Sequence, residues 1–314
     1  RGGGGAGGSG IVVMNYQVAN PTYAEYDLSI NTGAGDIDVN GALANLGELN
    51  LTSTSAGSEI SGIISTDTIV NKAGVGSLTL SSNNTYTGLT NIDVGTIIAT
   101  HANALGATSA GTVVDSGAAL AVSGGLTVAE PVSLSGTGVA SAGALSLISG
   151  NNTYSGAITL AADTLIKSTA GTPTLSATIN GGYALTTVAS DALTVSGVIG
   201  GTTPLTKVNL STTSGNLTLG NNIAVTGTGT DAMIFNAGSS TAAGTTTGGN
   251  IILSGSPTLT TGDGGRITFY TGSVSGSTGL TSLIGSGTHR FRYNSDETTT
   301  NYTATLSSGS YAIY

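Results

Sequence analysis

Apolar and polar residues alternate in short runs along most of the chain. From Leu28 onwards the apolar positions recur two residues apart, as in residues 28–30 (Leu-Ser-Ile) and 49–51 (Leu-Asn-Leu). Gly and Asn between the runs provide the positive-φ positions that sharp corners need. A period of two predicts short strands with one buried face. Residues 99–110 are the best helical candidate, but they lack a sustained apolar stripe, so we predict a loop or a single helical turn bulging from a coil.

One strand-turn-strand unit recurs along the chain with sequence changes between its copies. Residues 77–88 and 145–156 both contain Asn-Asn-Thr-Tyr, and residues 215–222 are a weaker echo that ends in Asn-Asn. Tyr86 and Tyr154 lie 68 residues apart, into which a coil of about 20–25 residues fits three times. The repetition predicts a stack of similar coils, a parallel β-solenoid. We interpret Tyr86 and Tyr154 as corner residues that pack on neighbouring coils rather than as a binding ladder.

Other segments also align and predict equivalent places in the coil. Residues 90–97 match residues 158–165. Residues 60–64 (Ile-Ser-Gly-Ile-Ile) match residues 195–199 (Val-Ser-Gly-Val-Ile), 135 positions later. These two blocks lead to Leu-Thr-Leu at 78–80 and at 217–219, respectively, which extends the second alignment.

The composition limits the classes of partner that the protein can bind and the cellular location in which it acts. Only 7% of residues are charged, whereas about 25% is usual, while 38% are hydrophobic and 51 are Gly. From these values we expect a neutral, hydroxyl-rich surface over a buried core. The net charge of −9 argues against binding to nucleic acid or to anionic lipid. The chain has no apolar run long enough for a transmembrane helix, and the absence of Cys favours bacterial secretion over a disulfide scaffold.

We divide the chain into a Gly-rich leader at 1–10, N-terminal coils or a cap at 11–58, and a repetitive β-solenoid at 59–314 that continues from those coils. Residues 16–26 carry Pro21 and three Tyr, and they are expected to cap the first coil or to insert over it. The chain has no initiator Met and no signal peptide, so we expect a processed or excised piece of a longer polypeptide.

The repeat also resembles a known family. Residues 78–88, 90–97, 102–106, 111–114 and 116–121 carry the resemblance. They resemble the autotransporter passenger-associated β-strand repeat. Residues 290–297, 301–303 and 312–314 are similar to segments of large filamentous-haemagglutinin-like exoproteins. The resemblance implies a right-handed parallel β-helix with little or no helix, secreted or displayed on a bacterial surface, and a role in adhesion, aggregation, biofilm structure or as a stalk.

Parallel β-helices also host polysaccharide-cleaving enzymes, which need two carboxyl groups at a defined separation. Asp36 and Asp38 are one candidate pair, but a solvent-facing strand explains both. Asp296 and Glu297 are the other, and a loop that balances nearby Arg residues explains them equally well. We therefore predict no catalytic residue.

Metal and phosphate sites find no support in the sequence. His101 and His289 are far apart and lack the spacing of a zinc site or a catalytic triad. Residues 262–265 (Gly-Asp-Gly-Gly) form a lone turn signal, and the Gly-rich leader lacks the helix that a phosphate loop requires. We predict no cofactor and no metal.

The best candidates for ligand contact are Arg290, Arg292 and Tyr293, with Tyr302 and Tyr311 nearby in sequence. Aromatic rings and guanidinium groups stack on sugars or form cation–π contacts. The alternative is an ordinary strand with an inward Phe291 between outward arginines. A third possibility is ice binding by aligned Thr rows, but the Thr clusters at 245–247 and 298–300 look like loops.

The sequence predicts a non-catalytic bacterial surface or extracellular-matrix structural protein or adhesin. We expect a rod whose copies associate end to end or laterally into filaments, with host-surface or matrix glycans as further partners. The alternatives are a carbohydrate-active β-helix enzyme and a glycan-binding module. Specific function is expected where the repetition fails, at residues 16–26, 99–110 and 289–314.

Overall fold

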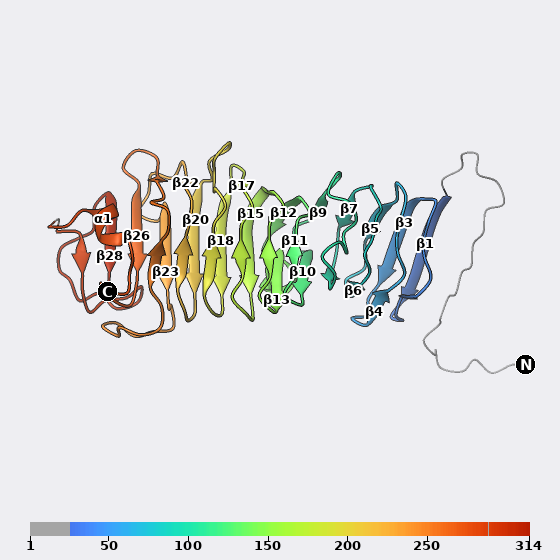
Figure 1. Cartoon of the computed structure of the whole chain (residues 1–314), viewed down its shortest axis with the longest axis horizontal. Coiled ribbons are helices and arrows are strands. Elements are labelled where there is room, and N and C mark those ends of the chain that lie inside the picture. The colour runs from blue at the N-terminus through green and yellow to red at the C-terminus, as the bar shows by residue number, and fades with distance from the viewer. Residues whose placement is uncertain (1–25, 288) are drawn as a thin grey trace, which may run out of the picture.

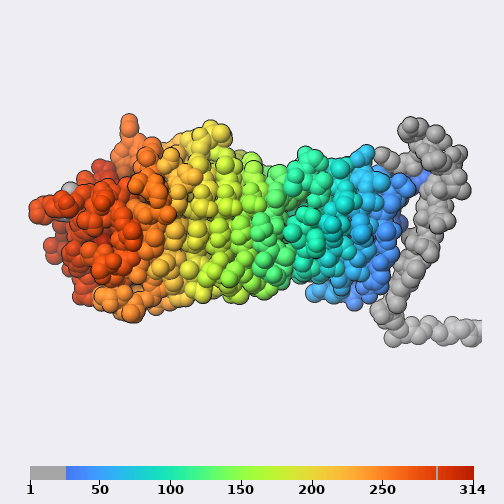
Figure 2. Space-filling view, viewed as in Figure 1, coloured from blue at the N-terminus to red at the C-terminus, as the bar shows by residue number. Residues whose placement is uncertain are grey.

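The strands wind into an all-parallel β-solenoid of about 13 turns, with 3% helix, in a computed structural model that describes residues 26–287 and 289–314. The predicted solenoid is therefore confirmed. Figure 1 shows a rod with β1 at one end and β28 with α1 at the other, and Figure 2 shows its continuous surface. The predicted leader at 1–10 and most of the predicted cap at 16–26 lie outside the described residues.

Each coil contributes to three faces, on which strands of successive coils pair in parallel. The first face contains β1 (Tyr26–Gly33), β3 (Leu46–Ser53), β5 (Ile69–Lys72), β7 (Thr90–Ile92), β9 (Thr112–Val114), β12 (Val132–Gly136), the first part of β15 (Ile158–Ser168), β17 (Ile179–Asn180), β22 (Ile223–Ala224) and β25 (Leu259–Thr260).

The second face contains β2 (Asp38–Val39), β4 (Ser58–Ile60), β6 (Ser77–Leu80), β8 (Thr96–Ala99), β10 (Ala119–Ser123), β13 (Leu145–Ser149), the second part of β15, β18 (Ala184–Ala189), β20 (Lys207–Thr212), β23 (Met233–Ala237), β26 (Arg266–Tyr270), β28 (Gly309–Ile313) and β27 (Phe291–Arg292).

The third face contains β11 (Thr127–Val128), β14 (Thr153–Tyr154), β16 (Thr174–Leu175), β19 (Leu193–Val195), β21 (Leu217–Leu219) and β24 (Ile251–Leu253). Within the described residues, the helical segments are a short 3-10 helix at Val139–Ser141 and α1 at Leu280–Ile284. Residues 101–110 form turns after the end of β8, so the predicted loop is confirmed. Its Ala104 and Leu105 are buried, so it turns partly into the core rather than away from it.

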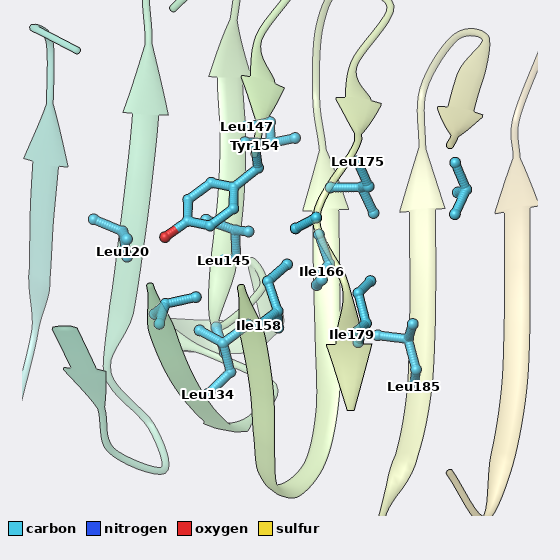
Figure 3. Packing of buried hydrophobic residues seen from close by; sticks show 14 of the residues in the cluster. Leu120, Leu134, Leu145, Leu147, Tyr154, Ile158, Ile166, Leu175, Ile179 and Leu185 are labelled. Atoms are coloured by element: carbon cyan, nitrogen blue, oxygen red, sulfur yellow. The ribbon is translucent and has the colours of Figure 1, made fainter. Parts of the chain in front are cut away.

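The core is a stack of inward side chains that repeat from coil to coil. Leu78, Ile97, Leu120 and Leu145 occupy one register position on four successive coils, and all four are fully buried. Figure 3 shows the ring of Tyr154 among such residues. Because each coil covers the apolar side of the next, the core continues without a break along the rod.

The spacing of the strong repeat copies has a direct structural explanation. Thr90 pairs with Thr112, which pairs with Val132, which pairs with Ile158, so three coils separate the equivalent positions. The prediction that a coil of about 20–25 residues fits three times between the copies is correct.

The second predicted alignment is wrong in its placement. Leu217–Leu219 lies on the third face, whereas the matching Leu-Thr-Leu of Ser77–Leu80 lies on the second face. Likewise Ile60 ends a strand of the second face, and Val195 ends one of the third. Coil lengths vary along the chain, so a constant sequence spacing does not keep a constant face.

The two Ser-Gly pairs nevertheless share one local role, a sharp corner after a strand. The backbone N–H groups of Ser61 and Gly62 both donate to the carbonyl of Val39, one coil earlier, and those of Ser196 and Gly197 both donate to Leu175. A Cβ at Gly62 or Gly197 would collide with a backbone carbonyl of the preceding coil. Close approach of the coils therefore requires glycine there.

Candidate functional site

The C-terminal end of the rod departs from simple winding. β28 pairs with β26 on one side and with β27 on the other, although β27 comes earlier in the sequence. The chain therefore passes the position of β28, forms β27, and returns to insert β28 between β26 and β27. This inverted order brings residues 289–314 together at the rod's end (Figure 1).

Arg290 and Arg292, both predicted as ligand contacts, are engaged within this end. The guanidinium of Arg290 lies 5.1 Å from the ring centroid of Tyr311 and donates a hydrogen bond of 2.9 Å to the carbonyl of Ser308. The guanidinium of Arg292 lies 5.3 Å from the ring of Tyr302 and 5.6 Å from that of Tyr311. A hydrogen bond with Ser307, aided by the two guanidinium groups, holds the pKa of Tyr311 below its usual value.

Tyr293, the third predicted contact, faces solvent. Its side chain is 60% exposed, and its ring stacks on that of Tyr314 with 5.6 Å between centroids. Phe291 packs against the core and also stacks on Tyr314, at 6.4 Å. An inward Phe291 is what the alternative of an ordinary strand predicts. The role of Arg290, Arg292 and Tyr293 in ligand contact stays a prediction.

A groove lies beside these residues, between the loop 237–247 and the segment 295–297. The groove is shallow, and its lining includes Asn236, Tyr270, Asp296, Glu297 and Tyr314. Tyr270 has a raised pKa because of partial burial. Sequence reasoning missed this groove, since its parts come from segments that are distant along the chain.

The side chain of Asp296 connects the segment 295–297 to the loop 237–247 in the wall of the groove. Its carboxylate accepts hydrogen bonds from the backbone N–H of Ala243, at 2.9 Å, and from the backbone N–H and hydroxyl of Thr298, at 2.7 and 2.8 Å. Burial opposes ionisation, but these hydrogen bonds prevail and hold the pKa of Asp296 below its usual value. The neighbouring Glu297 is exposed.

The other predicted carboxylate pair lies on an ordinary outer face near the opposite end. Ile37 is buried between Asp36 and Asp38, as the solvent-facing strand reading requires. Asp36 accepts a hydrogen bond from the hydroxyl of Ser55, and Asp38 is opposite Glu59 on the next coil.

The two histidines contribute no shared site. Nδ1 of His101 accepts a hydrogen bond from the backbone N–H of Asn103 at 3.1 Å, and His289 is exposed at the C-terminal end. In residues 26–287 and 289–314, no group of three or more His, Cys, Asp or Glu side chains could hold a metal ion.

Glu130 is a buried acid that is not among the predicted site residues. It is 3% exposed, and both carboxylate oxygens are buried. Burial raises its pKa to about 7, and the nearby backbone N–H of Gly111 opposes this shift. The hydroxyl of Tyr154 donates to the backbone carbonyl of Glu130 at 2.8 Å, and that of Tyr86 shares a 2.6 Å hydrogen bond with Thr90.

Lys72 is a buried basic residue elsewhere in the rod. It is 1% exposed, its Nζ donates to the carbonyls of Gly74 and Val94, and burial lowers its pKa to about 8. The alternation itself is the signal for both residues, because Lys72 lies two positions after Val70 and Glu130 two after Val128. A period of two places both inside the rod.

The passenger-associated-transport-repeat family profile matches residues 70–99. The match runs from β5 to β8 and includes the Tyr86 corner. No curated protein and no solved structure gives a significant match to the chain. The repeat match and the all-parallel solenoid together fit an autotransporter passenger repeat protein. This repeat is a structural element of passenger domains, which are secreted or displayed on the cell surface.

The similarity of the C-terminal run to filamentous-haemagglutinin-like proteins stays a prediction. None of the helices in the described residues has the length and apolar character needed to cross a membrane.

Proposed function

We propose that this chain is a non-catalytic structural rod of the bacterial surface or extracellular matrix, which acts in adhesion or assembly. The observation that carries the proposal is the continuous core, in which one cluster of buried residues extends from the first described coils to Tyr314. Such a rod spans distance with little conformational freedom, because each inner coil is held by backbone pairing on both sides.

The surface supports a structural role. The outward positions carry neutral groups that bond along the rod, such as the amide ladder in which Asn91 donates to Asn71 and Asn71 donates to Asn50, each at 2.8 Å. Rods of this kind extend one another end to end when backbone edges meet, and neutral faces permit lateral contact. Both modes of self-association are part of the proposal.

The enzyme alternative has less support. A glycosidase needs two carboxyl groups free to act on either side of a bond. Asp296 is committed to the N–H groups of Ala243 and Thr298, and Asp36 is bonded to Ser55.

Electron microscopy of the purified chain tests the structural role. We expect straight rods at low concentration and longer rods or bundles as concentration rises. Compact particles would contradict the rod, and rods of constant length at all concentrations would contradict assembly. Release of reducing ends from a panel of polysaccharides would overturn the non-catalytic assignment.

A test of adhesion uses bacteria that display the chain. They are expected to attach to matrix-coated surfaces more strongly than bacteria that display an unrelated protein through the same anchor. Equal attachment would contradict the adhesive role and leave the rod itself in place.

A further inference from the structure

We propose that copies of this chain join head to tail through the second face, with β27 of one copy pairing in parallel with β2 of the next. The proposal deepens the end-to-end association given above and rests on it. It commits to a second copy of the chain as the partner, and it places Arg292 of one copy beside Asp38 of the other.

One outward row of side chains runs along the second face from end to end. It begins at Asp38 of β2 and Glu59 of β4, and register partners on successive strands carry it to Arg292 of β27. The members between Glu59 and Arg292 are uncharged apart from Lys167. The same row therefore ends in two acids at one end of the rod and in a cation at the other.

The charges at the two ends of this row lack counter-ions within the chain. Asp38 and Glu59 are register partners, and like charges directly opposite each other on neighbouring strands are destabilising. In the described part of the chain, the one salt bridge joins Lys207 and Asp231, so neither these acids nor Arg292 have an ion-pair partner. A second copy placed end to end supplies the missing cation to the acidic pair.

The strand β2 has one paired edge and one free edge. The backbone N–H groups of Glu59 and Ser61 donate to the carbonyls of Ile37 and Val39, at 2.7 and 3.0 Å. Because successive residues of a strand direct their backbone groups to opposite sides, the N–H and C=O of Asp38 point away from β4. Among the described strands, β4 alone pairs with β2.

The strand β27 has the complementary free edge. The backbone N–H groups of Ala312 and Tyr314 donate to the carbonyls of Arg290 and Arg292, at 3.2 and 2.9 Å. The backbone of Phe291 therefore points away from β28, which is the described strand that pairs with β27. The guanidinium of Arg292 donates to the carbonyl of Phe291 at 3.0 Å, so the cation lies at this free edge.

A parallel junction that continues the register of the second face satisfies both edges. Phe291 directly precedes Arg292, and the buried Ile37 directly precedes Asp38. Pairing Arg292 with Asp38 therefore places Phe291, which packs against the core, beside Ile37 in the inward row. In this register the N–H of Asp38 donates to the carbonyl of Phe291. Apolar contact continues inside the rod, and opposite charges meet outside it.

The junction has a direction. It joins two different surfaces, so each added copy leaves a free β2 at one end and a free β27 at the other, and contacts of this kind give open filaments. Two β27 edges that met each other would run antiparallel and bring two Arg292 side chains together, which is unfavourable. Growth is therefore head to tail.

The test measures the rod length of the full chain by electron microscopy and sedimentation at increasing concentration. Asp38→Arg and Arg292→Asp should each raise the concentration needed for elongation by about tenfold or more, because each brings like charges together at the junction. The double variant exchanges the two charges and should elongate as the parent does. The matched control is Asp93→Arg, which reverses an exposed charge at the corner between β7 and β8 and should leave elongation unchanged.

Asp38→Arg separates a lost junction from a folding defect, because Asp38 is exposed and makes no side-chain hydrogen bond in the described structure. The proposal is overturned if the parent does not elongate, if both single variants elongate as the parent does, or if the double variant elongates no better than the single ones. The first result also removes end-to-end assembly from the proposed function, whereas the other two overturn this junction alone. Compact particles, which would contradict the rod itself, are a separate outcome.

Discussion

Tyr154 and Tyr293 are the same kind of side chain in two regions that are built differently. Tyr154 belongs to the regular coils, where it is fully buried and its hydroxyl bonds to the carbonyl of Glu130. Tyr293 belongs to the C-terminal end, where it is largely exposed and touches Tyr314. In the regular coils, the neighbours of a residue are its counterparts on adjacent coils. At the end, segments that are distant along the chain supply them.

The largest expected effect separates these two regions. Tyr154→Ala should destabilise the chain by about 3–5 kcal/mol, because it leaves a cavity in a continuous core. Tyr293→Ala should cost no more than about 0.5 kcal/mol, since the ring is at the surface. Urea unfolding followed by circular dichroism measures both. Equal costs would show that the C-terminal end is as tightly integrated as the coils.

The second prediction compares a buried and an exposed carboxyl. The folded pKa of Glu130, about 7, lies above the ordinary value of 4.5, so the fold favours the protonated form. Its stabilising contribution is complete below pH 4.5 and is lost as the pH rises through 7.

Glu130→Gln removes this dependence. At pH 9 the variant should be more stable than the parent by about 3 kcal/mol, and at pH 4 the two should be nearly equal. Unfolding curves across this range provide the measurement, with Glu297→Gln as the exposed control. A variant equally destabilised at both pH values would show that the carboxyl makes contacts that Gln cannot replace.

A third comparison concerns two glycines, Gly197 and Gly182, that differ in how closely the preceding coil approaches them. Gly197→Ala should cost about 1–3 kcal/mol, because the added methyl group meets the carbonyl of Ala177 on the preceding coil. Gly182→Ala meets nothing within 4 Å and should be neutral or slightly stabilising. The shift in thermal midpoint reports the difference. A tolerant Gly197 would mean that the coils can separate locally at a corner.

The smallest expected effect is in the amide ladder on the outside of the regular coils. Asn71→Ala removes two hydrogen bonds, to Asn50 and from Asn91, and should cost about 1 kcal/mol. The control is Asn209→Ala, which should change stability by less than about 0.5 kcal/mol. Asn209 is an exposed outward residue of β20 without a side-chain hydrogen bond in the described structure. Equal effects in denaturant unfolding would show that the ladder adds nothing to stability.

The sequence by itself determined which side chains point inward, how long a coil is, and that coils repeat. Alternation with a period of two is a local property of extended backbone, so it held even for Lys72 and Glu130, which are charged. The packing of Tyr86 and Tyr154 inside the rod also followed from the repeated Asn-Asn-Thr-Tyr, although Tyr154 lies in the strand β14 and not at a corner.

Only the tertiary structure decided which face a segment occupies and what meets at the end of the rod. The face depends on the summed lengths of all intervening turns, so the Ser-Gly pairs at Gly62 and Gly197 match in sequence but lie at different corners. The insertion of β28 between β26 and β27, and with it the groove beside Asp296, depends on contacts between distant segments. Local periodicity carries no information about such contacts, because it describes each residue only relative to its neighbours along the chain.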